Sequence, residues 1–195
     1  GTTNYAHHVP VFAVSIGVLE GGDPLIGVVH DPLRGHVFAA VRNQGAWLDG
    51  ASIRVSGTER LSDAVVGLDW GRHDRVRRQT VSLLGHVAPR CRALRGLGSA
   101  ALALAYVAAG WMDAYFHLAI RPWDVAAGKL LVLEAGGRCT TLQGGPHRVD
   151  SPSCLATNGP IHSHMLGIMQ AKLVETIRRR WHRFPADTLW TKRSP

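Results

Sequence analysis

The feature that most constrains the fold is a change in hydrophobic patterning near residues 56–62. Before this joint, short apolar runs alternate with turns rich in Gly, Asp and Asn; the runs cover residues 11–19, 25–29, 37–41, 46–48 and 53–55. Short apolar runs joined by tight turns are typical of antiparallel strands. The pattern therefore predicts that residues 1–60 form an antiparallel β meander.

After the joint, short apolar runs alternate with segments of helical spacing. The predicted strands cover residues 64–68, 91–94, 113–118, 138–142 and 154–157, and the predicted helices cover 74–87, 99–109, 124–135 and 161–178. Alternation of this kind predicts a layered α/β domain over residues 61–178. The basic tail, residues 179–195, matches no regular pattern, and we expect it to be disordered.

Composition excludes several classes of partner. A 195-residue chain that is 46% hydrophobic and 18% charged can bury a substantial core. No apolar run reaches the roughly 18 residues of a membrane span, so we expect no membrane partner. The net charge is +8, but residues 172–195 carry +5 of it, from seven basic and two acidic side chains. The remainder is nearly neutral for its size, so we expect no nucleic-acid partner.

The cysteines indicate the cellular compartment. Cys91, Cys139 and Cys154 are odd in number and scattered, and they fit neither a disulfide framework nor the spacing of zinc ligands. The histidines also show no metal-site spacing. We therefore expect reduced core thiols in a cytoplasmic protein.

Asp124 is the strongest candidate for chemistry. It follows the Pro122-Trp123 corner and precedes an apolar helix that starts with Ala126-Ala127-Gly128. One interpretation is a helix N-cap, since Asp is among the commonest capping residues. The other is a ligand of Mg²⁺, which uses one or two carboxylates together with phosphate oxygens of a substrate. The local sequence alone favours the cap.

Three further segments could face a ligand. Gly1-Thr2-Thr3 offers consecutive backbone N–H groups, which can hold a phosphate where a helix or turn begins. Gly98-Ser99-Ala100 enters a helix, with Ser99 either as its N-cap or as a contact for a ligand. His117 ends a strand just before the Asp124 corner, where open α/β sheets form a crevice; it is either structural or ligand-facing. The chain shows no Ser-His-Asp arrangement, Walker A loop or dinucleotide fingerprint.

Taken in order, these segments resemble the motifs of the inositol monophosphatase family, part of the lithium-sensitive, Mg²⁺-dependent sugar phosphatases. The similar motifs are Gly1-Thr2-Thr3-Asn4-Tyr5, Gly45-Ala46-Trp47-Leu48-Asp49-Gly50, Gly98-Ser99-Ala100-Ala101, Asp113-Ala114-Tyr115-Phe116, Pro122-Trp123-Asp124-Val125-Ala126-Ala127-Gly128 and Glu134-Ala135-Gly136-Gly137. They extend over about residues 1–170.

The resemblance implies an α-β-α-β-α sandwich without its N-terminal helices and first metal-binding segment. Residues 1–60 would then be the remainder of the family's first α+β domain. It also implies a homodimer that hydrolyses a phosphate monoester of a polyol or sugar by a metal-activated water, with two or three Mg²⁺ ions in the intact enzyme. By the same resemblance, Asp124 is a metal ligand, Gly1 and Thr2 bind phosphate, and Thr2 is catalytic because its hydroxyl orients the water. Ser99, Ala100 and His117 bind the substrate.

Two departures from the family leave alternatives open. His117 stands where the family often has Glu, so fructose 1,6-bisphosphate, histidinol phosphate and a phosphonucleotide remain candidates beside an inositol-1-phosphate-like substrate. The family's other metal ligands, one Glu and two Asp, precede the position of Gly1. We therefore expect these 195 residues alone to be inactive. An alternative of another class is a non-catalytic remnant that acts as a binding or dimerisation module.

Overall fold

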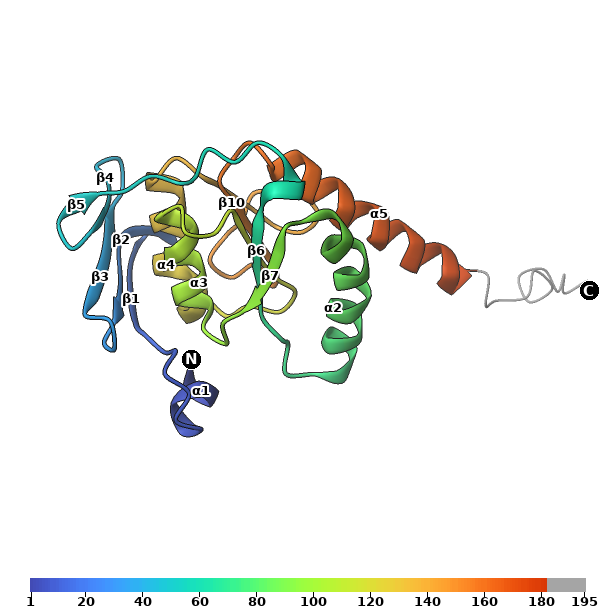
Figure 1. Ribbon diagram of the computed structural model, residues 1–195, viewed down its shortest axis with the longest axis horizontal. Helices are drawn as coiled ribbons and strands as arrows, with labels where there is room; N and C mark the ends of the chain where they lie inside the picture. The colour runs from blue at the N-terminus through green and yellow to red at the C-terminus, as the bar shows by residue number, and fades with distance from the viewer. Residues whose placement is uncertain (182–195) are drawn as a thin grey trace, which may run out of the picture.

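The computed structural model describes residues 1–181, with side chains up to residue 171. Its elements form four layers: a sheet, a pair of helices, a second sheet and a second pair of helices (Figure 1). This order matches the sandwich implied by the resemblance. Residues 179–181 belong to the last helix, so the prediction of a disordered tail is wrong for them; residues 182–195 lie outside the described part of the chain.

The first sheet is the predicted meander. Its strands are antiparallel and follow chain order: β1 (Val14–Glu20), β2 (Asp23–Asp31), β3 (His36–Val41), β4 (Gly45–Leu48) and β5 (Ala51–Ser52). The predicted strand at 53–55 is wrong, because Asp49 and Gly50 adopt positive φ angles of 50° and 84° and make a tight turn. Pairing therefore resumes at once, and Val55 N–H already donates to Ala135 of another layer.

The second sheet is mixed, with the strand order β7-β6-β8-β10-β9. β6 (Val65–Leu68) runs parallel to β7 (Ala93–Gly96) and β8 (Ala114–His117). β10 (Cys154–Thr157) is antiparallel to both β8 and β9 (Arg138–Thr140). Two short 3-10 helices, η1 (Leu61–Asp63) and η2 (Ala88–Arg90), precede β6 and β7. Since β6 and β8 are parallel neighbours, their carboxyl ends meet at one edge of this sheet.

Two apolar helices fill the space between the sheets. α3 (Ala100–Ala108) and α4 (Pro122–Glu134) pack against each other, and α4 also packs on β1 to β4 (Figure 1). Small residues permit this approach: a Cβ on Gly27 would lie 2.8 Å from the Ala127 carbonyl oxygen, and one on Gly128 would lie 2.5 Å from Leu104 Cβ. The small residues of α4 therefore let α3 and β2 approach this helix closely.

The outer helices cover the far face of the second sheet. α2 (Asp74–Val87) contributes Leu83 and Val87 to this core, and α5 (His162–Trp181) contributes Met165 and Met169. The short α1 (Thr2–Ala6) precedes the first sheet. Within residues 1–181, every helix is too short or too polar to cross a membrane.

Candidate functional site

Asp124 lies in the first turn of α4 but does not cap it. The N-cap is Arg121, and Asp124 N–H donates to the Arg121 carbonyl at 3.0 Å. No side-chain hydrogen bond caps this helix, so the capping interpretation of Asp124 is wrong. Among the described residues, no donor contacts the half-buried Asp124 carboxylate. An unpaired carboxylate at a helix N-terminus is stabilised by the helix dipole and is free to bind a cation.

A second carboxylate, Asp69, was not predicted from the sequence. It follows β6 directly and is 9% exposed. Gly98 N–H donates to one of its oxygens at 2.7 Å, and the Tyr115 hydroxyl donates to the other at 3.1 Å. Burial raises the pKa of Asp69, the two hydrogen bonds oppose that shift, and the nearby charge of Asp124 adds to it. The signal that could have found Asp69 is an acidic residue at the carboxyl end of a buried strand.

α1 is tied to the same region through Asn4. The Asn4 side-chain amide donates to the carbonyls of Val11 and Leu97, each at 2.7 Å. It packs so closely on Gly98 (φ 71°) that a Cβ there would lie 2.7 Å from the amide group. Gly1 is the N-cap of α1, as expected for a helix or turn that begins at this position. Thr2 is exposed in the first turn of α1.

Ser99 and Ala100 begin α3 beside the Gly98 turn. Ser99 is the N-cap, as predicted, but its side chain makes no capping hydrogen bond. The residue is 1% exposed, and its hydroxyl has no hydrogen-bond partner among the described residues. A buried hydroxyl without a partner costs about 1–3 kcal/mol relative to a hydrogen-bonded one. Capping therefore does not account for the Ser99 side chain, whose buried hydroxyl has no partner among the described residues.

His117 is the last residue of β8 and is 8% exposed. Its Nδ1 accepts a hydrogen bond from Ala119 N–H at 2.9 Å, which places the ring proton on Nε2. Burial lowers the pKa of His117, and the charge of Asp124 partly offsets that effect. The His117 ring is therefore neutral near pH 7, and its Nε2–H is available as a hydrogen-bond donor. The charge of Asp124 acts on this ring.

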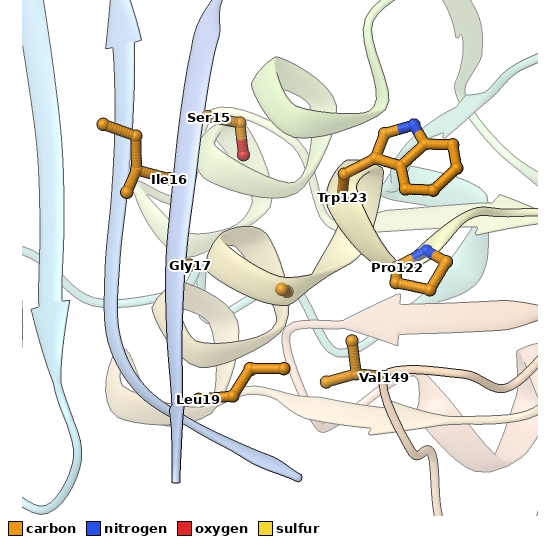
Figure 2. A pocket seen from close by; sticks show the side chains of 8 residues that line it. Ser15, Ile16, Gly17, Leu19, Pro122, Trp123 and Val149 are labelled. Carbon is orange, nitrogen blue, oxygen red and sulfur yellow. The ribbon is translucent and has the colours of Figure 1, made fainter.

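A cavity of about 400 Å³ opens on the other side of the α4 N-terminus. It lies between β1 and the start of α4 and is lined by Gly17, Leu19, Pro122, Ala126 and Val149, among others (Figure 2). None of the predicted site residues lines it. Trp123 also lines this cavity and is 70% exposed.

The structure thus brings most of the predicted residues into one region. Hydrogen bonds and charge interactions connect Asn4, Asp69, the Gly98 turn, His117 and Asp124. Ser99 and Ala100 adjoin this group through the chain, and Gly1 and Thr2 adjoin it through α1, to which Asn4 belongs. The elements that converge are the start of α1, the carboxyl ends of β6 and β8, and the starts of α3 and α4.

The sequence comparison agrees with this arrangement, because the model of the inositol monophosphatase family matches residues 1–182. The chain belongs to the inositol monophosphatase family. It is 38% identical over 180 residues to Nus factor SuhB of Escherichia coli K12, covering 92% of this chain and 67% of that protein. It is 36% identical over 178 residues to an inositol-1-monophosphatase of Mesorhizobium japonicum, covering 89% and 65% respectively.

Solved structures of family members share the fold. The inositol monophosphatase of Anabaena (Nostoc) sp. PCC 7120 superposes with a TM-score of 0.84 at 38% identity, over 88% of this chain and 68% of that one. An inositol monophosphatase of Thermotoga maritima gives a TM-score of 0.82 at 34% identity, over 89% and 66%. The chain therefore spans about two thirds of the length of these relatives.

Proposed function

We propose that this protein hydrolyses phosphate monoesters of a polyol or sugar in a Mg²⁺-dependent reaction. The observation that carries the proposal is the unpaired Asp124 carboxylate, which stands at a helix N-terminus beside Asp69 and His117. Membership of the inositol monophosphatase family supports the reaction class. The relative from Mesorhizobium japonicum, named an inositol-1-monophosphatase, supports a phosphorylated polyol as the substrate.

The residues present fit a hard divalent cation. Mg²⁺ prefers oxygen ligands, keeps several waters and commonly takes only one or two protein carboxylates together with substrate phosphate. Asp124 would be such a ligand, because its oxygens accept no hydrogen bond from the described residues. Asp69 is already committed to Gly98 and Tyr115, so we assign it to positioning the Gly98 turn. When bound, Mg²⁺ supplies charge neutralisation on the phosphate and lowers the pKa of a coordinated water.

The other residues take roles that follow from their placement. Backbone N–H groups at Gly1 and Thr2 point out of the first turn of α1 and would hold phosphate oxygens. The exposed Thr2 hydroxyl would orient the attacking water. His117 Nε2–H would donate to a substrate hydroxyl, and the unpartnered Ser99 hydroxyl, with Ala100 beside it, would contact the same part of the substrate.

The test is Mg²⁺-dependent binding of inorganic phosphate by calorimetry, together with phosphate release from inositol 1-phosphate. We expect Asp124→Asn to reduce phosphate binding by at least about 100-fold, because amide oxygen replaces the anionic ligand. Asp74→Asn is the matched control, since Asp74 lies in the first turn of α2 and is mostly exposed. It should change phosphate binding by less than about twofold.

Binding is the deciding measurement, because a single free carboxylate offers few ligands to a multi-metal site and we expect these 195 residues alone to release no phosphate. Equal phosphate binding by Asp124→Asn and wild type in Mg²⁺ would contradict the proposal and favour a non-catalytic module. Fructose 1,6-bisphosphate, histidinol phosphate and a phosphonucleotide, tested beside inositol 1-phosphate, then rank the substrate classes. Sedimentation of the same samples measures whether the chain is the homodimer that we expect of this family.

A further inference from the structure

A cluster of soft ligand atoms lies away from the carboxylates, in the part of the second sheet formed by β9 and β10. The Sγ atoms of Cys139 and Cys154 and a ring nitrogen of His147 all lie within 4.8 Å of one another. The spacing of these residues in the sequence gave no sign that they meet; all three cysteines are free thiols, as expected. Cys91 lies elsewhere, beside β7.

Strand pairing explains how the two cysteines meet. Cys139 of β9 pairs with Ala156 of β10, two residues from Cys154, so the cysteines occupy diagonal positions on one face. Their Sγ atoms are 3.5 Å apart. In a tetrahedral zinc site, Zn–S bonds of about 2.3 Å place two sulfurs about 3.8 Å apart. The sulfurs are therefore spaced for a shared zinc ion with little movement of either strand.

The connection between the strands carries the third ligand. A bridge between Thr140 and Pro146 closes the first half of this connection and fixes the residue that follows, His147. The His147 side chain is buried, with 5% exposed, and neither ring nitrogen has a hydrogen-bond partner among the described residues. Leaving buried polar atoms unpaired costs about 1–3 kcal/mol each, so this imidazole needs an explanation.

From this geometry we propose that Cys139, His147 and Cys154 form a binding site for Zn²⁺ or a similar thiophilic divalent cation. Two thiolates and one neutral imidazole are a common zinc donor set and leave a fourth position open. A ring nitrogen of His147 gains a partner on binding. A disulfide between Cys139 and Cys154 would leave both ring nitrogens of His147 without a partner, so a metal ion accounts for more of these observations than a disulfide does.

The charges around the cluster are compatible with a metal. Lys129 of α4 is buried and acts on His147 and Cys154; its own partner is Asp23, at 3.7 Å. Zn²⁺ with two thiolates adds no net charge beside Lys129. The neighbouring Cys139 and burial raise the pKa of the Cys154 thiol, whereas burial and Lys129 lower the pKa of His147 to about 4. His147 is thus already a neutral ligand, and formation of the two zinc–thiolate bonds releases the protons of both thiols to the solvent.

The test titrates the reduced chain with Co²⁺ in excess Mg²⁺, which occupies the carboxylate site. We expect one equivalent of Co²⁺ to give the near-ultraviolet thiolate-to-cobalt absorption and the visible bands of a tetrahedral site, and Zn²⁺ to remove both. Loss of an outer-shell partner of a metal ligand weakens metal binding roughly 10- to 100-fold. Cys139→Ala and His147→Phe each remove a ligand itself, so each should weaken Zn²⁺ binding by more than roughly 100-fold. Cys91→Ala is the control, since Cys91 is a half-buried cysteine like Cys139, and it should bind Co²⁺ as wild type does.

Three results would overturn the proposal. The first is a wild-type spectrum without thiolate-to-cobalt absorption. The second is a spectrum in Cys139→Ala that equals that of wild type. The third is protein purified without reductant whose mass and peptide map show a Cys139–Cys154 disulfide that Zn²⁺ does not prevent. Circular dichroism of each variant shows that it is folded, so a lost spectrum reports the site.

Discussion

Two polar regions lie side by side on the face of the second sheet that α4 covers. The first holds Asp69, His117 and Asp124, and the second holds the cluster of Cys139, His147 and Cys154. They touch through the β8–β10 pairing, in which His117 is opposite Cys154. The first region offers oxygen ligands and is partly open, whereas the second offers sulfur and nitrogen and is mostly buried. Ligand chemistry of this kind directs Mg²⁺ to one region and zinc-like ions to the other.

The difference also shows which kind of site a sequence displays. Two residues of the first region, His117 and Asp124, stand at element boundaries on either side of the Pro122-Trp123 corner, which forms a recognisable motif. The ligands of the second are joined by strand pairing and a bridged connection, and the spacing between Cys139, His147 and Cys154 carries no motif. A site that depends on strand register becomes visible only when the register is known.

The largest effect is expected from a substitution in α4, because this helix supports both regions. A Cβ on Gly128 would lie 2.5 Å from Leu104 Cβ and 2.6 Å from its Cδ1, so Gly128→Ala forces α3 and α4 apart. We expect a loss of about 3 kcal/mol of folding free energy, at the upper end for overpacking, and a melting temperature lower by roughly 6–12 °C. Thermal unfolding measures the shift, and both phosphate and Co²⁺ binding should weaken.

Gly85→Ala is the control for the substitution itself. Gly85 lies in α2, and a Cβ there would meet nothing within 4 Å. Alanine is the better helix former by about 1 kcal/mol, so this variant should be as stable as wild type or more so. If the two variants behave alike, the close contact between α3 and α4 is not what holds the two regions together.

The fold was largely predictable because its strands and helices follow simple periodicities. The helix Asp74–Val87 and the strand Cys154–Thr157 were predicted to the residue, since Asp and Gly or Pro residues mark their ends. The site was predictable only in part. Asp124 was recognised, but its N-cap role was wrong because Pro122 takes the first helical position and shifts the cap to Arg121. Asp69 was missed because no motif surrounds it, and its role depends on Gly98 and Tyr115 far along the chain.

Two buried histidines, His147 and His162, differ in whether their ring nitrogens have hydrogen-bond partners. His162 is 1% exposed and lies between two threonines, with Thr157 Oγ1 at 2.9 Å and Thr140 Oγ1 at 3.1 Å from its ring nitrogens. His162→Phe removes one hydrogen bond from each hydroxyl, although Thr140 still donates to the Thr141 carbonyl and Thr157 still accepts from Gly159 N–H, and it should cost about 2 kcal/mol. His147→Phe removes two unpaired nitrogens and, in metal-free protein, should leave stability unchanged or raise it by up to about 1 kcal/mol. Urea unfolding in chelator compares them, and an equal loss in both would mean that His147 has a partner in solution.

The smallest expected effect is the pH dependence of the unfolding free energy that His162→Phe removes. Burial, and next the charge of Arg138, lower the pKa of His162 in the folded chain to about 4, whereas the ordinary pKa of histidine is 6.5. The unfolded chain therefore binds a proton at higher pH than the folded chain does, so this histidine contributes its full stability above about pH 6.5 and loses it as the pH falls toward 4. Wild type loses this contribution on acidification, but His162→Phe has none to lose. The difference in unfolding free energy between the two should shrink from pH 7 to pH 5, and a difference that stays constant would show that His162 keeps an ordinary pKa in the folded protein. Comparing the two proteins at each pH removes the effect of Asp69, whose raised pKa acts in the opposite direction and is common to both.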